Sequence, residues 1–233
     1  GARLLETQRN NLAARWMPGF AAVWEQLRSY FAVSHESVGL KLRALMVPWT
    51  KKAWRRQKTT RVGGVDDDVV VYALPIDDAN APDLYLPLVS FMTFALVSAY
   101  VRGQAGTCTP EVLAQIISSC AIFQLFELVL YTAGLYVAGA GASLLDLTCY
   151  TGYKYVSLCF NMVATLSGGD RAYYAALTWT ALSSSYFMLK TMAQTVPTRT
   201  SGNGPRREFL VCGLGITQGC SIWLLGFLFK GTS

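Results

Sequence analysis

Histidine is almost absent from this sequence, and charged residues are scarce. The 233-residue chain has one histidine, His35, and 15% charged residues, whereas ordinary globular domains carry about 25%. Nucleophilic catalysis by serine or cysteine needs a neighbouring base, and His35 lies outside the apolar segments. A P-loop, a dinucleotide-binding glycine fingerprint and an HExxH motif are also missing. We therefore expect no catalytic residue, no cofactor and no metal.

Paired cysteine motifs are missing as well. The six cysteines show no CxxC spacing, and five of them lie in or beside apolar runs. A metal site would need clustered Cys and His, so we expect thiols that pack as small apolar side chains. Acylation of Cys149 or Cys212, both near a predicted membrane face, stays open.

Long apolar segments dominate the rest of the chain. Hydrophobic residues make up 52% of the sequence, and the mean hydropathy is +0.32. A transmembrane helix needs about 20 mostly apolar residues. Segments 84–101, 112–138, 144–166, 172–192 and 209–229 meet this need. The sequence therefore predicts an all-α membrane protein, with a polar head at 1–83 and a five-span transmembrane helical bundle at 84–233.

Loop charges predict the orientation of these spans. Residues 41–61 hold eight Lys or Arg and no acid, and four more basic residues lie at the end of the fourth segment and in the loop after it: Lys190, Arg199, Arg206 and Arg207. The loops on the other side hold one basic residue each, Arg102 and Arg171. Because cytosolic loops carry an excess of Lys and Arg, we expect a cytosolic N-terminal head and a luminal C-terminus.

The predicted head combines amphipathic helices with a basic, aromatic stretch. Apolar residues at helical spacing cover 20–31 and 38–46. Trp49 and Trp54 stand among basic residues, which favours an interfacial anchor on anionic lipid. The simpler alternative is that these helices pack on one another or on the membrane. The acidic stretch 66–78, with a short apolar run inside it, is interpreted as a solvated linker.

Two charged residues lie deep inside predicted spans, Glu127 in the second and Lys154 in the third. A rise of about 1.5 Å per residue places both roughly 15 Å from the cytosolic ends of their spans. A charge at the bilayer centre costs at least about 2.5–3.5 kcal/mol on insertion scales. Because a short link joins the two spans, we predict an ion pair between antiparallel neighbours.

Three interpretations of this pair stay open. It could hold the bundle together, form part of a proton or ion path, or contact another membrane protein. Gln124 and Asn161 are further candidates for hydrogen bonds across helices. Gly215 and Gly219 form a small-residue face that suits close packing inside the bundle.

Two ordered motifs carry a resemblance to a known family. The first, Asn-Ala-Pro-Asp-Leu-Tyr-Leu-Pro at 80–87, leads into the first predicted span, and the second, Tyr-Thr-Gly-Tyr-Lys-Tyr-Val at 150–156, lies in the third. Together they resemble the Yip-interacting-factor (YIF) branch of the Yip-domain membrane proteins. The positions that match the family motifs are Asp83, Leu84, Tyr85, Pro87, Gly152, Tyr153, Lys154, Tyr155 and Val156. Glu127 also matches, since family members have a glutamate in the second span.

The motif residues have plausible physical roles. Asp83 precedes a helix, where its carboxylate meets the positive end of the dipole. Pro87 suits a first turn, where its missing N–H has no partner to lose. Tyr85 suits the headgroup layer, and Gly152 lets a neighbouring helix approach.

The resemblance implies a non-catalytic adaptor in vesicle-mediated transport from the endoplasmic reticulum to the Golgi. Family members move between these membranes in transport vesicles, pair with a Yip-type membrane protein, and associate with Rab GTPases and COPII coat components. We expect the same partners here, together with the lipid bilayer and without nucleic acid. The alternative is a small transporter, channel or lipid-moving protein that uses Glu127 and Lys154.

Overall fold

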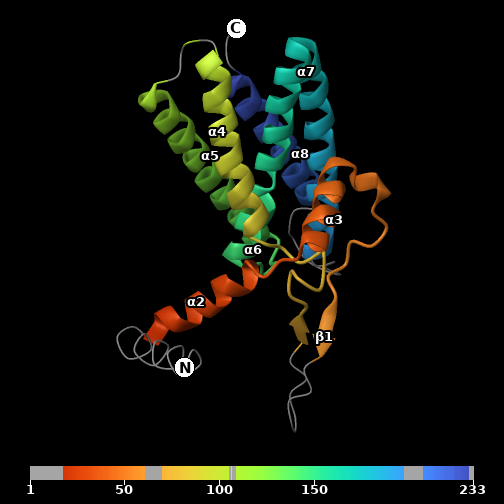
Figure 1. Ribbon diagram of the computed structural model, residues 1–233. Helices are drawn as coiled ribbons and strands as arrows, with labels where there is room; N and C mark the ends of the chain where they lie inside the picture. The colour runs from red at the N-terminus through yellow and green to blue at the C-terminus, as the bar shows by residue number, and fades with distance from the viewer. Residues whose placement is uncertain (1–17, 61–69, 105, 107–108, 197–206, 231–233) are drawn as a thin grey trace.

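The computed structural model describes residues 18–60, 70–104, 106, 109–196 and 207–230. Apart from one small β-hairpin, this part of the chain is helical (Figure 1). Several sequence-based predictions lie outside the described residues: the acidic cluster at 66–68, Cys108, and most of the basic loop between the fourth and fifth predicted spans.

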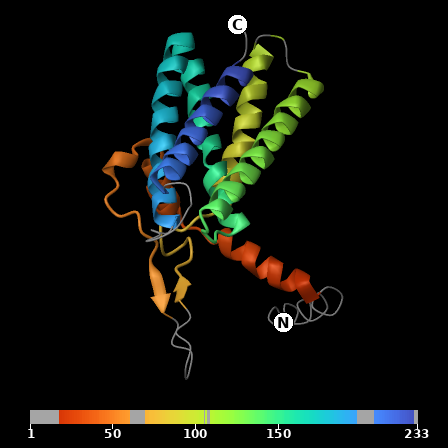
Figure 2. The same ribbon diagram turned by 180° about the vertical axis from the view of Figure 1, so that it is seen from behind.

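The long helices form one bundle, and together they cover all the predicted spans (Figures 1 and 2). They are α4 (Tyr85–Gln104), α5 (Pro110–Val137), α6 (Leu144–Gly152), α7 (Lys154–Thr195) and α8 (Arg207–Phe229). Tyr153 keeps a helical backbone between α6 and α7, with φ −60° and ψ −16°. The chain therefore passes from α6 into α7 without a loop.

Helix α7 folds back on itself at Gly169. This residue has φ +63° and ψ −154°, a conformation that glycine adopts without steric cost. The two limbs run antiparallel, because Ser157 Oγ lies 2.8 Å from Ser184 Oγ and the Thr180 hydroxyl donates to Asn161 over 3.0 Å. Residues 154–168 thus belong to the predicted third span, and 170–195 to the fourth.

Three of the described helices, α4, α5 and α8, are long and apolar enough to cross a membrane. The predicted third and fourth spans, in α6 and α7, are not among these three. The length and composition of α4, α5 and α8 make the chain a helical membrane protein.

Helices α7 and α8 pack closely through the small-residue face predicted from the sequence (Figure 2). A Cβ atom on Gly219 would lie 2.2 Å from Ser185 Oγ, and one on Gly215 would lie 3.1 Å from the Ser185 carbonyl oxygen. These glycines therefore serve contacts within the chain, and Ser185 supplies the facing surface.

The two described α-helices of the predicted head lie differently relative to the bundle. Helix α3 (His35–Met46) and the 3₁₀ helix Pro48–Thr50 pack against the second limb of α7. Trp179 Nε1 donates to the Met46 carbonyl over 3.0 Å, and Ser183 donates to the Leu45 carbonyl. Helix α2 (Pro18–Tyr30) instead extends away from the bundle in both views (Figures 1 and 2).

A short β-hairpin joins the end of the basic stretch to the apolar run inside the predicted linker, an element that the sequence analysis did not predict. Strand β1 (Lys58–Thr60) pairs antiparallel with β2 (Val70–Tyr72), with Thr59 opposite Val71. Valine, threonine and tyrosine favour strands, and the flanking aspartates hid this preference. The all-α prediction holds for the bundle and misses this element.

Candidate functional site at the head–bundle junction

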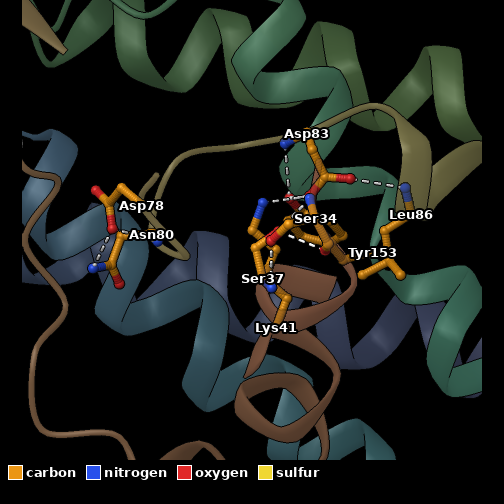
Figure 3. Close-up of polar contacts among 8 residues, drawn as sticks. All are labelled: Ser34, Ser37, Lys41, Asp78, Asn80, Asp83, Leu86 and Tyr153. Atoms are coloured by element: carbon orange, nitrogen blue, oxygen red, sulfur yellow. Dashed lines mark hydrogen bonds and ion pairs between the residues drawn. The ribbon is translucent and has the colours of Figure 1, made fainter. Parts of the chain in front are cut away.

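Asp83 lies at the centre of a buried polar cluster between the head and the bundle (Figure 3). Its Oδ2 atom accepts from Lys41 Nζ at 2.6 Å and from the Tyr153 hydroxyl at 3.0 Å. Its Oδ1 atom accepts from the Leu86 backbone N–H at 2.8 Å. We call Lys41, Asp83 and Tyr153 the junction cluster. It joins α3, the start of α4 and the joint between α6 and α7.

Local sequence explains how each member reaches this position. Ser34 and Ser37 form a capping box that starts α3, and Lys41 lies on the face of α3 that is buried against the bundle. Asp83 precedes α4 and caps its first turn through the Leu86 N–H.

The junction cluster compensates a fully buried carboxylate. Asp83 is 0% exposed, so its charge would be costly without partners. An ammonium, a phenol and a backbone amide all donate to it, and charge-assisted hydrogen bonds of this kind are the strong ones. The cluster can therefore fix where the head docks.

The two sequence motifs also pack on each other directly. A Cβ atom on Gly152 would lie 2.7 Å from Pro87 Cβ, which no real side chain tolerates without a shift. Only glycine lets the first turn of α4 approach α6 this closely. Pro87 and Gly152, which lie 65 positions apart, therefore form one contact.

The structure brings Glu127 and Lys154 together in an ion pair between α5 and α7. The side chains are 1% and 0% exposed. Lys154 Nζ also lies 5.3 Å from the centre of the Tyr155 ring. Among the described residues, no donor reaches the second oxygen of Glu127, Oε1. The pair thus joins two helices but leaves one acceptor unsatisfied.

Further polar contacts surround this pair. Gln124 Nε2 donates to Thr151 Oγ1 over 2.6 Å, so α5 and α6 share a hydrogen bond. Gln218 Nε2 donates to the Thr151 carbonyl over 3.3 Å, which adds α8. Thr151 therefore links three helices beside the charged pair.

The remaining motif residues lie at the edges of these two clusters. Tyr155 donates to the Cys120 carbonyl over 3.0 Å, and Val156 packs in the core. Leu84 is half-buried, and Tyr85 is 40% exposed on the outer face of α4. An outward tyrosine at the start of a span is where the headgroup layer would be expected.

Both tryptophans of the basic stretch pack on α7. The Trp49 ring centre lies 5.0 Å from that of Trp179, and the Trp54 ring centre lies 5.6 Å from that of Phe187. The alternative in which this stretch packs within the protein therefore accounts for the indole contacts.

Sequence reasoning missed Asp146, which joins the head to α6. Its carboxylate accepts from the Tyr30 hydroxyl at 2.6 Å and from Arg56 Nη1 at 3.2 Å. Burial, with help from the Asp146 charge, raises the pKa of the Tyr30 phenol, which therefore stays protonated as the donor. The available signal was a lone acid at the start of an apolar segment.

No group of three His, Cys, Asp or Glu side chains able to hold a metal occurs in the described part of the chain.

The three long apolar helices α4, α5 and α8 define this chain as a helical membrane protein. Its sequence matches the YIF1 family over residues 4–226, and the chain belongs to that family.

Similarity to individual relatives agrees with this assignment. Protein YIF1A of Mus musculus is 30% identical over 230 residues, which cover 96% of this chain and 75% of that protein. Protein YIF1B-B of Xenopus laevis is 31% identical over 183 residues, which cover 77% of this chain and 57% of that protein. Protein transport protein YIF1 of Saccharomyces cerevisiae is 32% identical over 149 residues, which cover 62% of this chain and 45% of that protein. No solved structure matches.

Proposed function

We propose that this chain is a non-catalytic membrane adaptor in protein transport between the endoplasmic reticulum and the Golgi. The single observation that carries the proposal is membership of the YIF1 family, whose yeast relatives are named protein transport proteins. On this proposal the chain pairs with a Yip-type membrane protein and presents its head to Rab GTPases and COPII coat components.

The proposed topology has five spans, with the head in the cytosol and the C-terminus in the lumen. Helices α4, α5 and α8 supply three spans. Helix α6 together with the first limb of α7 supplies another, and the second limb of α7 supplies the last. The fold-back at Gly169 supports this count, because it returns the chain to the end where α3 docks.

Helix α5 is the best candidate for contact with a Yip-type partner. Only 17% of its most apolar stretch is buried within the chain, against 50% for α8. Phe126 and Val129 are 64% and 67% exposed, and they lie on a face that does not carry Glu127. An apolar helix so weakly packed within its own chain suits association with another membrane helix.

Co-purification tests the adaptor proposal. The tagged chain, extracted from membranes in mild detergent, is expected to retain a Yip-domain protein. A charged substitution on the outer face of α5, Val129→Arg, should release that protein. The matched substitution Val23→Arg on exposed α2 should not. Recovery of no Yip-domain protein from the unmodified chain would remove the main support for the proposal.

A transporter or channel function is a second candidate, because Glu127 and Lys154 lie inside the bundle. The small pocket that Lys154 lines has no room for a water molecule, which favours the adaptor over a water-filled path. Purified protein in liposomes that moved protons, ions or lipids, with loss on Glu127→Gln, would favour the second candidate.

A further inference from the structure

A cavity of about 340 Å³ lies where the head docks on the bundle. Its walls come from α3 and the loop after it, from the linker at 79–81, from α6 with the loop before it, and from the end of α7. Small-ligand sites typically enclose about 300–1,000 Å³. The cavity is therefore large enough for a small ligand and exists only when the head is docked.

Positive charge dominates the charged lining. The lining cations are Lys41, Lys51, Arg55 and Arg56, against the acid Asp146. Lys41 is neutralised by Asp83, and Arg56 is paired with Asp146. Among the described residues, no carboxylate lies within 4.0 Å of Lys51 or Arg55. The cavity lining thus includes two cations, half-buried Lys51 and exposed Arg55, that have no carboxylate partner in the part of the chain that the structure describes.

Lys51 is half-buried at the cavity wall. Burial lowers the pKa of its ammonium to about 8, Asp78 opposes this shift, and Lys41 adds to it. The Asp78 carboxylate is occupied by the backbone N–H groups of Gln57 and Asn80, each at 2.8 Å. Lys51 has therefore lost water without gaining a contact to any carboxylate that the structure describes, and a bound anion would restore the lost stabilisation.

We propose that this cavity binds a phosphate group, with Lys51 and Arg55 as its main contacts. An arginine fork and a lysine ammonium are the side chains that phosphate oxygens accept from most readily. The cavity differs from a flat basic surface, because four segments of the chain form its walls and Lys51 Nζ lies over the Trp54 ring, 4.9 Å from its centre.

The phosphate could belong to a lipid headgroup or to a soluble anion. The cavity lies beside the beginning of α6 and the linker that leads into α4, where apolar helices start. In a membrane this is the level of the headgroups. This placement favours a phospholipid whose headgroup carries a phosphate monoester, and the test must separate the two sources. The site requires no Yip-type partner.

Protection of Lys51 from an amine-reactive reagent tests the proposal on the unmodified chain. The purified protein is reconstituted in phosphatidylcholine nanodiscs, and labelling of each lysine is followed by mass spectrometry across a pH series. The probes are inorganic phosphate, discs that contain phosphatidylinositol 4-phosphate, and discs that contain phosphatidylserine at the same total charge. The exposed neighbour Lys52 is the internal reference.

We expect phosphate to slow labelling of Lys51 several-fold and to raise its pKa above 8, because a bound anion stabilises the ammonium. Labelling of Lys52 should not change. Protection by phosphatidylinositol 4-phosphate alone assigns the site to lipid, whereas equal protection by inorganic phosphate assigns it to a soluble anion. No protection by any phosphate probe, or equal protection of both lysines, overturns the proposal. So does equal protection by phosphatidylserine.

Matched variants test the same site by affinity. Lys51→Met and Arg55→Met should each weaken binding of the effective probe about tenfold, the effect of losing one charge-assisted hydrogen bond. Lys52→Met removes the same charge one residue away, outside the lining, and should leave the affinity unchanged. Equal losses in Lys51→Met and Lys52→Met would reduce the effect to general attraction by the basic stretch. If a variant fails to fold, the labelling experiment on the unmodified chain alone tests the proposal.

Discussion

Lys41 and Lys154 are both buried lysines paired with a carboxylate, yet the two pairs hold different parts of the molecule. Lys41 meets Asp83 across 42 positions and ties the head to the bundle. Lys154 meets Glu127 across 27 positions and ties two neighbouring helices. Asp83 has further donors in Tyr153 and Leu86, whereas Glu127 Oε1 has none among the described residues.

Asp83 is thus the shared acceptor of several donors, whereas Glu127 accepts from Lys154 alone in the part of the chain that the structure describes. A buried ion pair that stands alone can be replaced by apolar side chains at little cost, while removal of one partner leaves an uncompensated charge. A carboxylate that several donors share cannot be replaced by an apolar side chain in that way, because its other donors lose their acceptor as well. Mutations that remove one or both partners should therefore behave differently at the two sites.

The largest effect is expected at the intramembrane pair. Glu127→Leu or Lys154→Leu alone should lower the free energy of unfolding by about 3–5 kcal/mol, because each leaves a buried charge without its partner. The double substitution should recover most of that loss. Unfolding of the purified protein in detergent micelles measures all three variants. An equal loss of unfolding free energy in the single and double variants would contradict the ion pair.

The junction cluster should respond in another way. Asp83→Leu removes the acceptor of three donors, and adding Lys41→Leu relieves only the unpaired ammonium. The double variant should remain about 2 kcal/mol or more below the unmodified protein, since the Tyr153 hydroxyl and the Leu86 N–H stay unsatisfied. A double-mutant cycle measures this. Full recovery would make the two pairs equivalent and remove the distinction.

The contact between the two motifs should give a smaller loss. Gly152→Ala forces Pro87 aside and should cost about 1–3 kcal/mol, as overpacking does. Gly213→Ala in α8 is the matched control, because nothing lies within 4 Å of its new Cβ. That variant should be neutral or gain up to about 1 kcal/mol from helix propensity. Thermal unfolding of both variants compares them directly.

The smallest effect is expected from a single hydroxyl of the cluster. Tyr153→Phe removes one donor to the Asp83 carboxylate and the acceptor of the Asp83 backbone N–H, and should cost about 1–2 kcal/mol. Tyr150→Phe is a control in the same aromatic contact, whose hydroxyl makes no hydrogen bond to any residue that the structure describes. If both changes cost the same, the Tyr153 hydroxyl contributes nothing specific to the junction.

Local pattern predicted much of the architecture. Apolar runs located all five bundle segments, and helices begin and end within a few residues of the expected limits. Rise per residue and a short link were enough to place Glu127 and Lys154 at one depth, because α5 packs beside α6 and Lys154 follows α6 directly. Such arguments work when the contact depends on neighbouring elements.

Contacts between segments that lie far apart in the sequence could not be predicted from local patterns. Asp83 was expected only to cap α4, and its pairing with Lys41 depends on how α3 docks against α7. No periodicity in the sequence encodes that docking. The cavity beside Lys51 was hidden for the same reason, because four separate segments build it.

Hydrogen–deuterium exchange in nanodiscs tests the role of Asp83 most directly. Asp83→Asn keeps the shape of the side chain and removes its charge, whereas Glu127→Gln does the same at the intramembrane pair. We predict faster amide exchange throughout α3 (His35–Met46) in Asp83→Asn and unchanged exchange there in Glu127→Gln. Unchanged protection of α3 in Asp83→Asn, or equal loss in both variants, would contradict the conclusion that Asp83 holds the head on the bundle.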